Sequence, residues 1–145
     1  MKTRRILHPS DFSSASRAAF GKALEIAKTE GAELVLIHVT VPVSRDGGSF
    51  VPSRVYEDLR RWIRTDALGH LDKLLAQARS AGVRARPLVV DGAPVERIVR
   101  AARAHHADLI VMGTHGQSGL KRLLLGSVAE RVAGTAHCPV LTVRG

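Results

Sequence analysis

The sequence contains a single cysteine, Cys138, among its 145 residues. An internal disulfide is therefore excluded, and a reducing compartment is favoured. Aromatic residues make up only 3% of the chain, so the core must consist of Val, Leu, Ile and Ala. No apolar run approaches the length of a membrane-spanning helix, and the basic start Met1–Arg5 is not followed by the apolar stretch of a signal peptide. These absences favour a cytoplasmic protein with no membrane partner.

Acidic residues are also scarce, with 13 Asp and Glu against 22 Lys and Arg, which gives a net charge of +9. This excess favours anionic partners without choosing among phosphates, nucleic acid and membrane surfaces. Nucleic acid is the weaker hypothesis, because Trp62 and Tyr56 belong to one helical pattern and form no stacking platform. Arginine groups at helical spacing predict solvated helix faces: Arg60/Arg61/Arg64 and Arg97/Arg100/Arg103.

Short β-branched apolar runs alternate with segments whose apolar residues recur every three or four positions. The former pattern is typical of buried strands and the latter of amphipathic helices. Strict alternation predicts one α/β domain over residues 1–145, with five parallel strands and helices on both faces of the sheet. The expected strands are Arg5–Leu7, Leu34–Val39, Val83–Val90, Leu109–Met112 and Val140–Val143, and the expected helices are Ser14–Thr29, Ser53–Ala81, Pro94–His105 and Ser127–Thr135.

A glycine-rich loop follows the fourth expected strand, with Gly113, Gly116 and Gly119 ahead of Gly126-Ser127. Glycines at the carboxyl end of a strand let backbone amides approach a ligand closely. Ser127 is expected to cap the last helix, whose first amides stay unpaired at the positive end of the helix dipole. This arrangement predicts an anion site with phosphate as its usual occupant. The spacing fits neither the Walker A pattern nor GxGxxG.

The same spacing resembles the signature of the universal stress protein family, in its ATP-binding branch. That signature is Gly, two residues, Gly, nine residues, then Gly-Ser or Gly-Thr, and Gly113, Gly116 and Gly126-Ser127 match it. The resemblance covers essentially the whole chain, from Arg4 to Arg144. Four further segments look like strands and turns of the family: Ile6–Ser13, Leu36–Val39, Ala107–Gly116 and Cys138–Val143.

The resemblance implies a Rossmann-like sheet of the adenine nucleotide alpha hydrolase-like type, with the strand order 3-2-1-4-5. Strands one and four then end side by side where the winding reverses, which is where open α/β sheets bind ligands. The implied ligand is ATP, alone or with magnesium or manganese. If the family's contacts apply to the matching residues here, the backbone of Val39 recognises the adenine edge near Pro9, and Asp11 lies beside the ribose or a phosphate-bound metal.

The carried-over phosphate site consists of amides from the loop and the last helix, with the Ser127 hydroxyl. The amides are those of Gly116, Gly126, Ser127 and Val128. The complete set of candidate nucleotide-binding residues is Pro9, Ser10, Asp11, Val39, Gly113, His115, Gly116, Gly119, Gly126, Ser127 and Val128.

Some of these residues also have structural interpretations. Asp11 could cap the first helix together with Ser13 or Ser14. His115 could face solvent instead of phosphate. Lys121-Arg122 could reach a γ-phosphate or simply keep the loop soluble.

The remaining histidines and the cysteine are expected to be structural. His8 and His38 lie on strands, and His8 and Ser10 depart from the apolar residue and the Thr that the family usually has there. His105-His106 are adjacent, so they face different directions on a helix and make a poor metal pair. Cys138 is expected to be buried in the last strand.

These observations predict an ATP-binding regulatory or sensor protein of the stress response, with little or no hydrolysis. No acid lies between Gly113 and Ala129 to orient a water molecule. A slow ATPase or a nucleotidyl transferase is the alternative. A transferase would want a paired-histidine motif or a Ser-Gly-Gly loop where this chain has Pro9–Phe12.

Two further features concern partners and motion. The last expected strand, Val140–Val143, is an apolar sheet edge, which predicts a homodimer; any other protein partner stays unidentified. The irregular segment Val41–Pro52 is long for a compact domain and is expected to act as a flap over the nucleotide.

Overall fold

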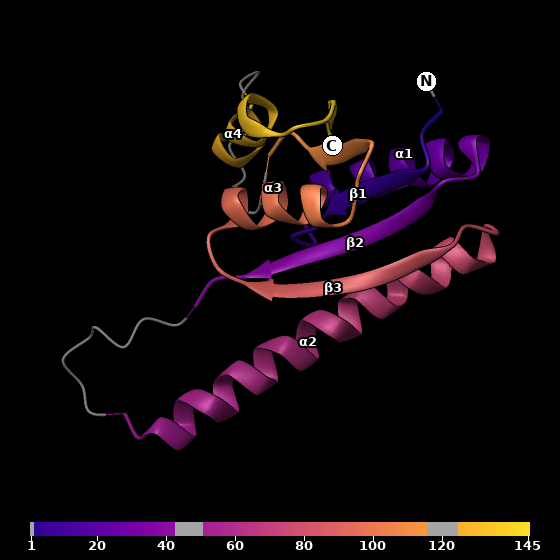
Figure 1. The fold of residues 1–145 in the computed structure, drawn as a ribbon. Coiled ribbons are helices and arrows are strands. Elements are labelled where there is room, and N and C mark those ends of the chain that lie inside the picture. Colours follow the sequence, from indigo (N-terminus) through magenta and orange to yellow (C-terminus); the bar gives the residue numbers. More distant parts are fainter. Residues whose placement is uncertain (1, 43–50, 116–124) are drawn as a thin grey trace.

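The computed structural model describes residues 2–42, 51–115 and 125–145. Within these residues strands and helices alternate along the chain, as the sequence pattern predicts (Figure 1). The strands are β1 (Arg5–Pro9), β2 (Glu33–Thr40), β3 (Ala85–Asp91), β4 (Leu109–Gly113) and β5 (Val140–Val143). The helices are α1 (Ser14–Glu30), α2 (Ser53–Ser80), α3 (Pro94–Ala104) and α4 (Ser127–Thr135).

The five strands form one parallel sheet in the order β3-β2-β1-β4-β5, which confirms the expected fold class. Ile6 at the centre pairs with Leu34 of β2 on one side and Leu109 of β4 on the other. The chain runs from β1 outward through β2 to β3, and then crosses to β4 on the other side of β1 before it ends at β5. The direction of winding therefore reverses between β1 and β4. The carboxyl ends of these two strands therefore meet at the position where open α/β sheets bind ligands.

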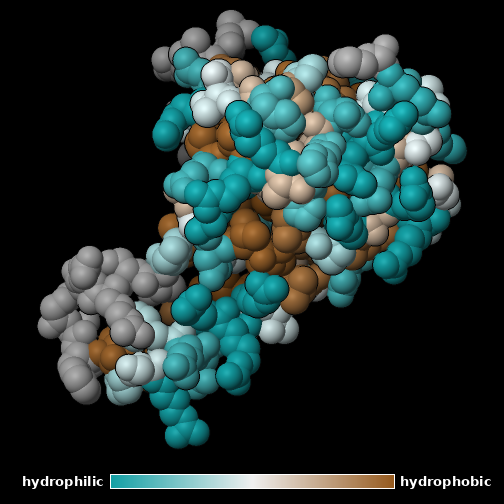
Figure 2. Space-filling model, in the orientation of Figure 1, coloured by the Kyte–Doolittle hydropathy of each residue, from teal (hydrophilic) through white to brown (hydrophobic). Residues whose placement is uncertain are grey.

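Two aliphatic layers hold the sheet between its helices. Helices α1 and α2 pack on one face, around Ile6, Leu34 and Leu36, and α3 and α4 pack on the other, around Leu7 and Val35. Alternate residues of β1 and β2 enter opposite layers, as the strand period of two requires. Figure 2 shows hydrophobic residues over β2 and β3 beside α3, so the α3–α4 layer leaves part of its sheet face visible.

The helix ends follow their sequence signals. Ser13 caps α1, with its hydroxyl accepting from the Ser16 amide at 3.2 Å. Gly31 ends α1 at φ +68°, a left-handed conformation that favours glycine. Pro94 is the first residue of α3, where its missing N–H costs no helical hydrogen bond. None of the helices in the described ranges is both long and apolar enough to cross a membrane.

Three expectations need correction. β1 continues two residues beyond Leu7, because Pro9 still pairs with Ile37. β3 begins at Ala85 instead of Val83. Val83 is buried in the core but belongs to the turn after α2, in which Gly82 adopts φ +75°. Cys138 is half-buried and precedes β5, so it is neither in the strand nor fully inside.

Candidate functional site

The turn after β1 is held in shape by its own side chains. The Ser10 hydroxyl accepts from the Phe12 amide at 3.2 Å, and Asp11 Oδ1 accepts from the Ser13 amide at 3.0 Å and the Ser16 hydroxyl at 2.6 Å. Phe12 adopts φ +65°, an uncommon conformation for a residue with a side chain. One Asp11 oxygen therefore fixes the entry to α1, which supports the structural interpretation of this residue.

A three-ring stack that the sequence did not suggest supports this turn. The Phe12 ring lies between His38 of β2, with ring centres 4.6 Å apart, and His70 of α2, at 4.7 Å. His38 Nδ1 also lies 2.7 Å from the Ser10 carbonyl oxygen, so it ties β2 to the turn. His38 is thus structural, as expected. Sequence pattern alone misses the stack because its members lie far apart in the chain.

The backbone groups at the end of β2 point alternately toward β1 and β3. Ser10 N–H donates to the Ile37 carbonyl at 2.9 Å, so the polar groups of Ile37 point toward β1. In a parallel sheet these groups alternate between the two neighbouring strands, so the N–H and C=O of Val39 also point to the β1 side. Thr40 points the other way, and its carbonyl accepts from the Gly92 amide at 3.0 Å. Because β1 ends at Pro9, which pairs with Ile37, no residue of β1 pairs with Val39.

The end of β4 and the start of α4 are joined directly. The Gly126 amide donates to the Thr114 carbonyl oxygen at 2.6 Å. A Cβ on Gly126 would lie 2.7 Å from that same oxygen, so a side chain cannot be accommodated there without a shift. Gly113 is equally constrained, because a Cβ would lie 2.9 Å from the Ala15 carbonyl carbon in α1. Both glycines are therefore needed for close packing of backbone.

The expected role of Ser127 as helix cap is wrong. Gly126 is the capping residue, at φ −61° and ψ 155°, and no side chain caps this helix; Ser127 is its first helical residue and is exposed. The first intrahelical bond runs from Glu130 N–H to the Gly126 carbonyl at 2.9 Å. The amides of Ser127, Val128 and Ala129 therefore precede the first such bond and are oriented out of the helix. The error does not remove the predicted anion site, because the amides and not the hydroxyl of a cap provide it.

Most of the predicted site residues meet at one edge of the sheet. Pro9, Ser10 and Asp11 end β1, and β4, which pairs with β1, ends at Gly113 and continues through Thr114 to His115. His115 is half-buried, and its Nδ1 lies 3.0 Å from the Thr114 hydroxyl oxygen. The candidates that lie outside the described residues are Gly116, Gly119, Lys121, Arg122 and most of the Val41–Pro52 segment.

His8 is the most perturbed titratable group close to this edge. It is fully buried, its Nδ1 lies 2.8 Å from the Val111 carbonyl oxygen, and among the described residues its Nε2 has no hydrogen-bond partner. Burial lowers the pKa of His8 from 6.5 to about 4, against smaller opposing effects of the Val111 carbonyl and Asp11. The imidazole is therefore neutral at physiological pH and links β1 to β4, which supports its structural interpretation.

Two further findings concern metal ligands and the cysteine in the described ranges. They contain no group of three His, Cys, Asp or Glu residues that could hold a metal ion. Burial raises the pKa of the Cys138 thiol, so the thiolate is disfavoured at neutral pH.

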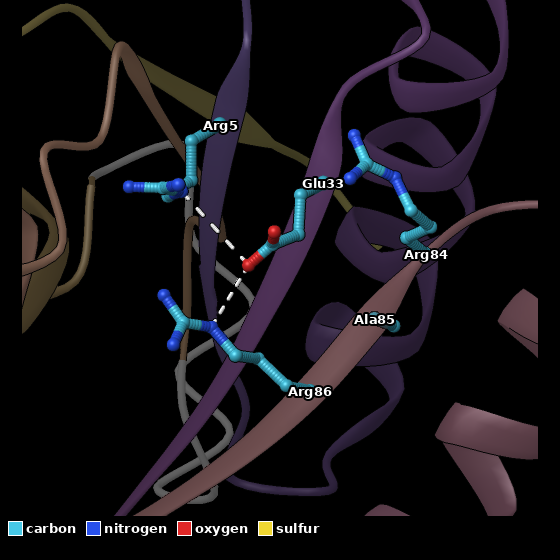
Figure 3. Close-up of a pocket in the computed structure, with 5 residues that line it drawn as sticks. All are labelled: Arg5, Glu33, Arg84, Ala85 and Arg86. Atoms are coloured by element: carbon cyan, nitrogen blue, oxygen red, sulfur yellow. Dashed lines mark ion pairs between the residues drawn. The ribbon is translucent and has the colours of Figure 1, made fainter.

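The opposite, amino edge of the sheet carries a charged depression of about 290 Å³ (Figure 3). Glu33 at the start of β2 forms an ion pair with Arg86 at 2.8 Å and a longer one with Arg5 at 3.9 Å. Arg5 also donates to the His105 carbonyl oxygen at 2.6 Å, and Arg86 Nη2 lies 3.1 Å from His105 Nδ1. Burial, and then Arg86, lower the pKa of His105. This network joins β1, β2, β3 and the end of α3 on the far side from the candidate site.

Comparisons with known proteins give a consistent result. A family model described as "Universal stress protein family" matches residues 2–144. The chain is 41% identical over 142 residues to universal stress protein MJ0531 of Methanocaldococcus jannaschii, covering 97% of this chain and 82% of that protein. The structure superposes on protein MJ0577 of the same organism with a TM-score of 0.87 at 29% identity, covering 100% and 98% of the two chains. It also resembles a universal stress protein solved in complex with cAMP, with a TM-score of 0.73 at 27% identity and coverage of 99% and 98%.

Proposed function

The chain belongs to the universal stress protein family, and on that premise we propose that it binds an adenine nucleotide, ATP, at the carboxyl edge of the sheet. The base lies against the exposed backbone of Val39 beside Pro9. The phosphates lie at the first amides of α4, together with the glycine loop. The similar protein solved with cAMP supports adenine as the base, since the two ligands share it.

The direction of the Val39 backbone groups, toward the side of β1 beyond the last β1 pair, carries this proposal. The C=O of Val39 can accept from the adenine amino group and its N–H can donate to the neighbouring ring nitrogen. Guanine presents an acceptor oxygen where adenine has that amino group, so it would leave the Val39 carbonyl unsatisfied. A buried group left without its hydrogen bond costs about 1–3 kcal/mol, which is roughly 5- to 150-fold in affinity.

The phosphate half of the site rests on close backbone contact. Gly126 places the start of α4 against the end of β4 through its 2.6 Å bond to Thr114. The amides of Ser127 and Val128 then lie at the positive end of the helix dipole. Both halves of the site use main-chain groups, which explains why glycines and strand ends, and not a cluster of charged side chains, mark it in the sequence.

The test has two steps. Native mass spectrometry of the purified protein would show an adenine nucleotide that remains bound. Calorimetric titration with ATP, AMP and GTP, with and without magnesium or manganese, should then give roughly 5- to 150-fold tighter binding of ATP than of GTP. The difference between ATP and AMP measures the contribution of the outer phosphates. Absence of ATP binding, or equal affinity for GTP, would contradict the proposal.

We further propose that nucleotide occupancy, and not turnover, carries the function. A site that holds ground state and transition state equally well does not accelerate a reaction, and efficient phosphoryl transfer needs a positioned water and specific charge stabilisation. Asp11, the acid nearest the turn, is engaged by the Ser13 amide and the Ser16 hydroxyl. Phosphate release should stay far below about 1 per second. Enzyme-like release that Asp11→Asn abolishes would establish the alternative, an ATPase.

Pairing through β5 is the assembly that the sheet edge supports. β5 is an outer strand of the sheet, and Leu141 on it is 38% exposed. An exposed apolar edge of this kind favours pairing with its own copy. Sedimentation equilibrium at micromolar concentration should show a dimer that Leu141→Lys dissociates. A monomeric parent protein would contradict it.

A further inference from the structure

The pairing of β2 with β1 stops at Ile37, although β2 itself continues to Thr40. The last bond of the parallel pattern runs from the Ser10 amide to the Ile37 carbonyl oxygen, at 2.9 Å. In a parallel pair, one residue bonds to the two residues that flank its partner. One step further, Val39 would therefore donate to the Ser10 carbonyl oxygen and accept from the Phe12 amide. Neither bond forms among the described residues.

Both of the groups that Val39 would use are engaged by side chains. His38 Nδ1 lies 2.7 Å from the Ser10 carbonyl oxygen, and since a carbonyl oxygen only accepts, this ring nitrogen carries the hydrogen. The Phe12 amide donates to the Ser10 hydroxyl at 3.2 Å. Phe12 also adopts φ +65°, which is incompatible with an extended strand. Two side chains thus take the partners that a continued ladder would give to Val39.

The imidazole that holds the Ser10 carbonyl is itself fixed by aromatic packing. The Phe12 ring lies at 25° to the His38 ring with centres 4.6 Å apart, and at 28° to the His70 ring with centres 4.7 Å apart. Stacked rings at such distances stabilise one another beyond the area that they bury. His70 belongs to α2, so this helix backs the stack at the end of β2. The stack therefore holds the His38 ring in the orientation that its hydrogen bond requires.

We propose that His38 and Ser10 are positioning residues that keep the main chain of Val39 available to an adenine base. The inference rests on the adenine site proposed above and names the side chains that create it. His38 takes the acceptor of the Val39 N–H, and Ser10 takes the donor of the Val39 C=O. Neither role requires contact with the base, because each side chain acts through a hydrogen bond that it withholds from Val39.

Removal of the imidazole should let the ladder close by one further bond. Ser10 is only 6% exposed, and a buried carbonyl oxygen without a donor is costly. Once His38 no longer supplies that donor, the parallel pattern supplies the Val39 amide in its place. The N–H that reads the base in the proposed site would then be engaged within the protein.

The first test of this role needs no ligand. Amide hydrogen exchange followed by NMR compares Val39 in the parent chain, in His38→Leu and in His38→Asn. His38→Leu should slow exchange of the Val39 amide, because this amide gains the Ser10 carbonyl oxygen. His38→Asn should return exchange toward the parent rate, because its side-chain nitrogen can take the place of Nδ1. A residue that only stabilises the strand would have the opposite effect, so faster or unchanged exchange in His38→Leu would overturn the proposal.

Calorimetric titration with ATP and GTP connects this effect to the base. His38→Leu should weaken ATP binding about tenfold, the contribution of one hydrogen bond, and should reduce the preference for ATP over GTP. His38→Asn should recover most of both. His137→Leu is the matched control, with the same substitution at an exposed histidine beyond α4, and it should change neither. Affinity and preference in His38→Leu that equal those of the parent would overturn the proposal.

Two further variants keep the test decisive if His38→Leu does not fold. Ser10→Ala removes the hydroxyl that holds the Phe12 amide, and His70→Leu removes the exposed outer ring of the stack. Both should weaken ATP binding and its preference over GTP, by smaller factors than His38→Leu, and parent-like values in both would overturn the proposal. A parent chain that binds no ATP would contradict the proposed function instead, while Val39 exchange still decides whether His38 withholds the Ser10 carbonyl.

Discussion

The two edges of the sheet satisfy their polar groups in opposite ways. At the amino edge, charged side chains pair within the protein: Glu33 binds Arg86 and Arg5, and Asp108 accepts from the amides of Arg4 and Arg5 at 2.8 and 3.0 Å. At the carboxyl edge, we propose that main-chain groups of Val39 and of the start of α4 receive a ligand. The amino edge is thus paired within the protein, whereas the proposed site relies on groups that a ligand would pair.

This contrast shows why net charge is a poor guide to the site. The chain carries +9, and the amino edge gathers three arginines around one carboxylate in Figure 3. Those guanidinium groups are already engaged in part by Glu33 and by His105. In the function that we propose, the carboxyl edge attracts an anion through oriented amides, which add no formal charge to the sequence.

The largest expected effect tests His8, one residue before the carboxyl edge. Because its folded pKa of about 4 lies below the unfolded value of 6.5, the unfolded chain binds the proton first as pH falls. Stability is fully present above pH 6.5 and is lost between pH 6.5 and 4, by about 3 kcal/mol in total. Urea unfolding at pH 7.5 and pH 4 measures this loss. In His8→Leu the difference in unfolding free energy between the two pH values should be smaller by that amount, whereas the control His137→Gln should keep it. An equal difference in the parent protein and both variants would refute the assignment.

The next prediction compares substitutions of two glycines, one that caps α4 and one within it. Gly126→Ala places a Cβ 2.7 Å from the Thr114 carbonyl oxygen, so the start of α4 must move, at a cost of about 1–3 kcal/mol in stability. Displaced amides should lower nucleotide affinity by about tenfold or more. Gly134→Ala is the control in the same helix, since no atom lies within 4 Å of its Cβ, and it should gain about 0.5–1 kcal/mol. Thermal unfolding and calorimetric titration would record both, and unchanged ATP affinity in Gly126→Ala would remove the amides from the site.

A smaller effect distinguishes the structural from the ligand role of Asp11. Ser16→Ala removes the hydroxyl that donates to Asp11 Oδ1 and should cost about 1 kcal/mol of stability. Asp11→Asn keeps an oxygen for the cap and removes the charge. If the residue only shapes the turn, its ATP affinity should match that of the parent protein. A large loss of affinity with unchanged stability would instead place the carboxylate next to the ligand.

The smallest effect is expected at the amino edge. Glu33→Gln removes the carboxylate that two arginines share, but these side chains are partly exposed, and solvent screening reduces such pairs to about 0–1 kcal/mol. ATP affinity should not change, because the network lies at the far end of the strands. A change in affinity comparable to that of Gly126→Ala would break the contrast between the edges.

The alternation of elements predicted the parallel α/β class, and the family resemblance implied the strand order that the structure confirms. The sequence also placed the candidate site residues at strand ends, and their role in binding stays a prediction. The error at Ser127 arose because a serine before a helix is a common cap, while the decisive fact, the 2.6 Å approach of Gly126 to Thr114, is tertiary. The Phe12 stack with His38 and His70 was missed for the same reason.

The sequence also misjudged α2. Its apolar spacing continues through Val55, Leu59 and Trp62, but periodicity does not reveal where a helix leaves the sheet. The end of β3 at Asp91 shows where α2 leaves the sheet: Arg60 and Arg64 still bond to β3, whereas the start of the helix extends past it (Figure 1).

Backbone amide NMR during ATP titration tests the central claim most directly, because the proposed contacts are main-chain groups. The account predicts that the largest shifts occur at Val39 and at Ser127 to Ala129, with Arg84 to Arg86 at the amino edge unaffected. Shifts confined to the amino edge, or absent from both Val39 and the start of α4, would contradict it.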